Sequence, residues 1–121
     1  MDTRFWGPDG WKLLHSVTSG YPKVPTLQLK DTYRIWFHSL PEVLPCIYCR
    51  RSLAQYYQEL PPIKHRAFDS CENLSTWIYH IHNKVNDKLR KQGLNDRNDP
   101  TLQKILKRYC GNEEVKCLQG W

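Results

Sequence analysis

The chain has 121 residues, and its 18 Lys and Arg against 12 Asp and Glu give a formal net charge of +6. This length predicts one domain spanning residues 1–121. The aromatic fraction of 12%, with five Trp and seven Tyr, excludes a disordered chain. The basic residues are spread along the sequence, and no apolar run is long enough for a membrane span. We therefore expect neither a nucleic-acid partner nor a membrane, and the first residues show no secretory signal pattern.

Proline and glycine separate segments that have helical periodicity, and no segment reads as a strand of period two. The first predicted helix opens at Pro8, runs for about ten residues and ends before Gly20. The second covers 27–40 and stops at Pro41. The third covers 46–60 and begins at a pair of cysteines. These segments predict an all-α chain.

The fourth predicted helix is the clearest, because 73–91 carries one continuous apolar stripe. Gly93 is a natural stop for it. A short fifth helix is predicted to start with Asp99 as its N-cap and Pro100 in its first turn. The sequence therefore predicts a four-helix bundle with a short fifth helix and a C-terminal tail, 110–121, that is flexible.

Cys46 and Cys49 form the only closely spaced cysteine pair. Pro45 places Cys46 near the start of a helix, where unpaired backbone N–H groups and the helix dipole stabilise a thiolate. Arg50 and Arg51 add positive charge. Two intervening residues in a first helical turn bring the sulfurs within bonding reach, which favours a redox-active dithiol.

Two other interpretations of this pair remain open. It could be half of a zinc site completed by Cys110 and Cys117, although the six residues between those two are a poor spacing for a zinc knuckle. It could also be a structural disulfide, although so short a loop stabilises little. A thioredoxin-like protein would need a βαβ frame, which an all-helical chain lacks.

One edge of the fourth helix carries Trp77, His80, Lys84, Lys88 and Lys91. An aromatic ring, an imidazole and three ammonium groups suit a stacked base and a pyrophosphate. A solvent-facing helix edge with cations near its C-terminus is the alternative interpretation.

Three polar residues, His82, Asn83 and Asn86, lie close to the apolar stripe of the same helix. Each of them could also be an ordinary surface group. By periodicity alone, Trp11 and His15 of the first helix would be core residues.

Four segments, taken together, resemble the Erv/ALR family of FAD-linked sulfhydryl oxidases in its minimal single-domain form, including versions from large DNA viruses. The match covers about 5–91. The segments are Trp6-Gly7-Pro8-Asp9-Gly10-Trp11 with Leu14-His15, Leu44-Pro45-Cys46-x-x-Cys49, Trp77-x-x-His80-x-His82-Asn83-x-Val85-Asn86, and Lys88-Leu89-x-Lys91.

The resemblance implies a helical bundle that holds FAD at one mouth, commonly as a homodimer, with no metal. The cofactor contacts that it implies are Gly7, Pro8, Trp11 and His15 on the first helix, Trp77, His80, His82, Asn83, Asn86, Lys88 and Lys91 on the fourth, and Arg108 and Tyr109 near the end.

The implied activity is oxidation of a protein dithiol, in a thioredoxin-like or small cysteine-containing partner, with electrons passing to FAD and then to O2 to give H2O2. Cys46 would exchange with the substrate, and Cys49 would face the flavin. A zinc-stapled or basic binding module without catalysis is the alternative. The compartment implied is the cytoplasm of an infected cell or a virion for a viral protein, and otherwise the mitochondrial intermembrane space.

The chain also departs from the family pattern. Tyr79 stands where the family often has a cysteine that bridges to the C-terminal segment. Cys110 and Cys117 could form a shuttle pair, a structural disulfide or an intersubunit link, and the sequence leaves the role of Cys71 open. The dense aromatic content relative to a small core predicts a homodimer through apolar faces of the first two helices, using Trp36, Phe37 and their neighbours.

Overall fold

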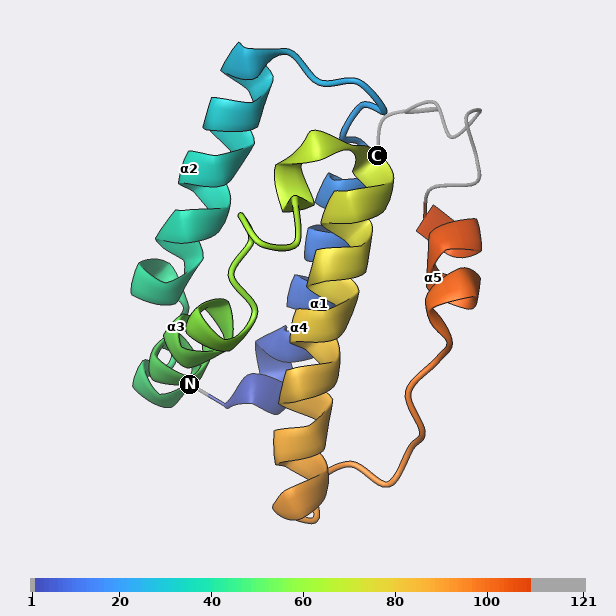
Figure 1. Ribbon diagram of the computed structural model, residues 1–121. Helices are drawn as coiled ribbons and strands as arrows, with labels where there is room; N and C mark the ends of the chain where they lie inside the picture. The colour runs from blue at the N-terminus through green and yellow to red at the C-terminus, as the bar shows by residue number, and fades with distance from the viewer. Residues whose placement is uncertain (1, 110–121) are drawn as a thin grey trace, which may run out of the picture.

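A computed structural model describes residues 2–109, which form a bundle of α-helices (Figure 1). No strand occurs within this part of the chain, so the prediction of an all-α fold is confirmed. No helix in the described range is long and apolar enough to cross a membrane. The predicted tail, 110–121, lies outside the described residues. The helices are α1 (Thr3–Ser19), α2 (Leu27–Val43), α3 (Ile47–Glu59), α4 (Cys71–Lys91) and α5 (Leu102–Tyr109), with a 3₁₀ turn, η1 (Ala67–Asp69), before α4.

Helix α4 lies at the centre of the bundle and contacts α1, α3, η1 and α5, while α2 packs on α3 and η1 (Figure 1). Its apolar stripe supplies Leu74, Trp77, Ile78 and Ile81, each at most 1% exposed. Phe37 of α2 meets them at 0% exposure. Burying each of these side chains stabilises the fold by about 2 kcal/mol, which explains why the clearest sequence pattern became the central helix.

The ends of α4 are set by its own residues. Ser70 is the N-cap, and its hydroxyl accepts a hydrogen bond from the backbone N–H of Asn73 at 3.1 Å. At the other end Gly93 has φ of 73°, a left-handed conformation that glycine adopts without strain. The backbone N–H of Leu94 then bonds the carbonyl of Leu89 at 2.8 Å, which completes a Schellman motif. The predicted stop is confirmed.

Two prolines lie inside helices that they were predicted to open or close. Helix α1 begins at Thr3, capped by Asp2, so that Pro8 is interior. Helix α2 continues past Pro41 to Val43. A proline at 41 cannot donate to the carbonyl of residue 37, but the hydroxyl of Tyr57 donates to the Phe37 carbonyl at 2.9 Å instead. A side chain of α3 therefore replaces the missing helical hydrogen bond.

The prediction of Asp99 as the N-cap of the fifth helix was wrong. Helix α5 starts at Leu102, and the hydroxyl of Thr101 accepts from the backbone N–H of Lys104 at 3.3 Å. The carboxylate of Asp99 is held instead by side chains of α4. The segment 92–101 that connects α4 to α5 is called the strap below.

Candidate active site

The sulfur pair, Cys46 and Cys49, sits at the start of α3 as the sequence predicted. Cys46 is the N-cap, with an extended backbone, and its carbonyl accepts the first helical hydrogen bond from Arg50 at 3.0 Å. Both residues are partly exposed and are present as thiols. Cys49 follows three positions later, so that both sulfurs lie in the first turn, where backbone N–H groups have no helical partner.

The two thiols have opposite acidities. The backbone N–H and then the thiol of Cys49 lower the pKa of Cys46. Because the Cys46 side chain makes no cap hydrogen bond of ordinary geometry, these N–H groups act on its sulfur as nearby dipoles. Burial, followed by the hydrogen bond to Cys46, raises the pKa of Cys49 to about 11. Of the two thiols, Cys46 therefore loses its proton more readily than Cys49.

Helix α4 supplies a cation to this pair. The ammonium of Lys88 lowers the pKa of Cys49, opposing the larger effect of burial. It also donates to the hydroxyl of Ser52, one turn after Cys49 on α3, at 2.6 Å. This hydrogen bond fixes where the Lys88 charge lies. Sequence reasoning named Lys88 but missed Ser52, since only packing shows which residue of α3 faces α4.

A second group of residues, the aromatic cluster, consists of Trp11 and His15 on α1 and His82 on α4. The rings of Trp11 and His82 are stacked, with centroids 3.7 Å apart and planes inclined by 6°. His15 Nε2 and His82 Nδ1 share a hydrogen bond of 3.0 Å. Burial lowers the pKa of His82 to about 4, and the neighbouring His15 adds to this. His82 is therefore a neutral ring at physiological pH.

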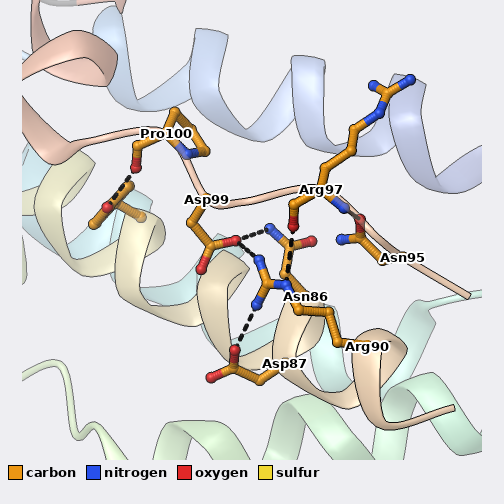
Figure 2. A network of polar contacts seen from close by, with 8 residues as sticks. Asn86, Asp87, Arg90, Asn95, Arg97, Asp99 and Pro100 are labelled. Carbon is orange, nitrogen blue, oxygen red and sulfur yellow. Dashed lines mark hydrogen bonds and ion pairs between the residues drawn. The ribbon is translucent and has the colours of Figure 1, made fainter. Parts of the chain in front are cut away.

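The strap is bound to α4 through polar side chains (Figure 2). Its residue Asp99 is near enough to His82 of the aromatic cluster to raise the pKa of that ring, against the larger effect of burial. The amide of Asn86 donates to Asp99 at 3.0 Å, and Arg90 forms an ion pair with the same carboxylate. The hydroxyl of Tyr79 donates to the carbonyl of Pro100 at 2.6 Å. Asp99 and Arg90 were not predicted as site residues, and nothing in their local sequence indicates this pairing.

The other predicted site residues lie in different places. Trp77 belongs to the core at 1% exposure, and its indole N–H donates to the Leu60 carbonyl at 2.8 Å. Gly7 and Pro8 lie in the first half of α1, and Lys91 is exposed at the end of α4. His80 and Asn83 line a surface hollow of about 270 Å³ that includes no residue of the aromatic cluster, and its other lining residues are Leu60, His65, Lys84 and Asp87.

The last predicted residues lie at or beyond the end of the described chain. Arg108 is on α5, and its charge lowers the pKa of His15, after the larger effect of burial. The side chain of Tyr109, and all of Cys110 and Cys117, lie outside the described residues. Within 2–109 no three His, Cys, Asp or Glu side chains are grouped closely enough to hold a metal ion.

Comparisons with known proteins agree on one family. The model of the Erv1/Alr family matches residues 8–110. The mitochondrial FAD-linked sulfhydryl oxidase ERV1 of Saccharomyces cerevisiae is 37% identical over 90 residues, which are 74% of this chain and 46% of the relative. A probable FAD-linked sulfhydryl oxidase of Acanthamoeba polyphaga mimivirus is 40% identical over 86 residues, 71% of this chain and 59% of the relative. The chain thus spans about half the length of these curated relatives.

Solved structures show the same relationship. The FAD-binding domain of Erv1 from Saccharomyces cerevisiae superimposes with a TM-score of 0.78 at 32% identity, covering 92% of this chain and 96% of that one. The yeast Erv1 core superimposes with a TM-score of 0.77 at 30% identity, covering 100% of this chain and 87% of that one.

Proposed function

Because the chain belongs to the Erv1/Alr family, we propose that it is an FAD-linked thiol oxidase that uses Cys46 and Cys49. The reaction removes two electrons and two protons from a protein dithiol, forming a disulfide, and reduces O2 to H2O2. The observation that carries this proposal is the split acidity of the sulfur pair, in which the pKa of Cys46 is lowered and that of Cys49 is raised. Such a split separates an exchanging sulfur from a more buried one.

The dithiol exchange follows from these acidities. A substrate thiolate attacks Cys46 in the oxidised pair, so that the substrate–Cys46 bond forms and the Cys46–Cys49 bond breaks. Cys49 leaves as a thiolate, which Lys88 stabilises because its charge lowers the pKa of Cys49. The second substrate thiolate then attacks the substrate sulfur of the mixed disulfide and releases Cys46. The lowered pKa of Cys46 makes it a good leaving group for this step.

Several features of the described residues fit a flavin dinucleotide. Trp6 Nε1 and Arg50 Nε are buried without a hydrogen-bond partner among residues 2–109, so carbonyl or phosphate oxygens of a ligand would satisfy them. A side chain added at Gly7 would meet no atom within 4 Å, which indicates open space beside α1. Lys88 and Lys91 offer charge for a pyrophosphate. When bound, FAD supplies the electron acceptor and the route to O2.

The test is an absorption spectrum followed by oxygen uptake with dithiothreitol. We expect visible flavin absorbance in the purified protein and oxygen consumption that Cys46→Ser and Cys49→Ser abolish while flavin stays bound. Cys71→Ser is the matched control and should retain turnover, because Cys71 is buried at the far end of α4. A colourless protein containing one equivalent of zinc, or normal turnover in Cys49→Ser, contradicts the proposal.

We also propose that the chain forms a homodimer through α1 and α2. The support is a set of exposed apolar side chains on these helices, among them Leu13 at 59%, Leu27 at 80% and Ile35 at 70%. Trp36 is 38% exposed and remains a candidate contact. Phe37 was wrongly predicted to lie in the interface, because it is fully buried in the core. Sedimentation that shows only monomer at micromolar concentration contradicts the dimer.

A further inference from the structure

We propose that Asp99 is a positioning residue, through which α4 holds the strap and α5 over the aromatic cluster and orients Asn86 toward the cofactor. This inference rests on the proposed function, since it concerns the site where FAD would bind. The ion pair between Arg90 of α4 and Asp99 of the strap takes no part in the dithiol exchange, and the proposal gives this ion pair a structural role.

The guanidinium of Arg90 binds three acceptors at once (Figure 2). Its Nη1 contacts Asp87 at 2.6 Å, its Nε donates to the Arg97 carbonyl at 3.0 Å, and its Nη2 contacts Asp99. Asp87 lies on α4 itself, whereas Arg97 and Asp99 belong to the strap. Because a planar guanidinium has fixed donor directions, satisfying all three acceptors sets the position of the strap against the helix.

The Arg90–Asp99 pair is partly shielded from water. The side chains are 28% and 23% exposed, whereas that of Asp87 is 62% exposed. A shielded pair of this kind contributes more than an exposed one, and removing one partner leaves the other charge poorly solvated. Of the two contacts that the Arg90 guanidinium makes with the strap, the one to Asp99 is the ion pair, because the other is to the backbone carbonyl of Arg97. Tyr79 adds its hydrogen bond to Pro100 one residue later.

Asp99 also determines how Asn86 presents its amide. The NH2 group of Asn86 donates to Asp99 at 3.0 Å, and the amide oxygen points away from the carboxylate (Figure 2). A carboxylate accepts hydrogen bonds only, so it fixes which end of the amide faces it. The amide oxygen of Asn86 is therefore held on the side away from Asp99, where it can accept a hydrogen bond from a hydroxyl or N–H group of a ligand.

The strap continues into α5, which packs on both α4 and α1. The strap and α5 together form one unit, and charged side chains of this unit change the pKa of both histidines of the aromatic cluster. Asp99 raises the pKa of His82, opposing burial, and Arg108 lowers that of His15. The unit therefore lies on the side of α4 that carries His82. Loosening the strap at Asp99 should free α5 and expose the aromatic cluster.

The test compares Asp99→Asn with Asp87→Asn, which removes the other carboxylate of Arg90 without touching the strap. Limited proteolysis and hydrogen exchange of the strap in cofactor-free protein measure attachment without relying on FAD. Fluorescence titration with FAD measures the site. We expect Asp99→Asn to speed strap cleavage severalfold at low salt and to weaken FAD binding about tenfold, the scale of one lost charge-assisted contact. Asp87→Asn should resemble the wild type in both.

Salt gives an independent check, because it screens a partly exposed ion pair. Strap cleavage in the wild type should rise with salt toward the rate of Asp99→Asn, whose own rate should stay flat. Unchanged cleavage in Asp99→Asn overturns the proposal, as does faster cleavage with unaltered FAD affinity. A wild-type chain that binds no FAD refutes the proposed function instead, and the cleavage assay still reports on the strap.

Discussion

Among residues 2–109, a cysteine lies at the start of two helices, as the N-cap of α3 and as the first residue of α4, and the surroundings give the two thiols different properties. Cys46 caps α3 at the surface, where N–H dipoles lower its pKa. Cys71 is the first residue of α4 and is 7% exposed. Its sulfur lies 3.3 Å from the Thr18 carbonyl, to which the thiol donates. A helix start therefore activates a thiol only where a base or substrate can reach it and no acceptor holds its proton.

The largest expected difference between the two thiols is in their rate of alkylation. Iodoacetamide at neutral pH should modify Cys46 of the reduced protein about a hundredfold faster than Cys71, because the thiolate is the nucleophile and Cys71 is both buried and hydrogen-bonded. Peptide mass spectrometry over time measures both rates in one sample. Equal rates in the folded protein would show that the local environments do not differ as described.

The second test compares the effect of substituting each cysteine on the free energy of unfolding. Cys71→Ala should lower the free energy of unfolding by about 1–2 kcal/mol, through lost packing and the loss of the thiol hydrogen bond to the Thr18 carbonyl, which keeps its bond from the Tyr21 N–H. Cys46→Ser should leave it unchanged or slightly higher, since serine is a preferred N-cap. Urea denaturation checks both. The comparison fails if Cys46→Ser is the more destabilised variant.

The third test concerns Lys88, the cation that α4 places near Cys49 at the start of α3. Lys88→Met removes the cation that lowers the pKa of Cys49, so that this pKa should rise further and turnover should fall about threefold to tenfold. Lys84→Met is the matched control, because Lys84 pairs with Glu59 at 3.4 Å. Steady-state oxygen uptake distinguishes them, and an equal loss in both variants would point to a general effect of charge.

The smallest expected effect concerns pH. Alkylation of Cys46 should slow as pH falls through its lowered pKa, because the thiolate becomes protonated. Cys49→Ala removes the thiol donor but keeps the backbone N–H, which is the larger cause. The pKa of Cys46 should therefore rise, and the loss of reactivity should begin at higher pH. A profile identical to that of the wild type would mean that the Cys49 thiol does not donate to Cys46.

The helix order and the position of the sulfur pair could be predicted from the sequence, because both depend on neighbouring residues. The stripe on α4, Gly93 after it and Pro45 before Cys46 act within a few residues of where they stand. The predictions failed where a distant partner intervened. Pro41 does not end α2, because Tyr57 satisfies the carbonyl that it leaves, and Asp99 does not cap α5, because Arg90 holds it.

By itself the sequence determined the all-helical fold, the position of the cysteine pair at the start of α3 and, through resemblance, the family. Only the tertiary structure decided which polar residues of α4 act together. It stacks His82 on Trp11, turns His80 into a separate hollow and brings Lys88 to Ser52. The physical reason is that a helix with 3.6 residues per turn presents successive residues to different neighbours. Which neighbours these are depends on packing between segments far apart in the chain.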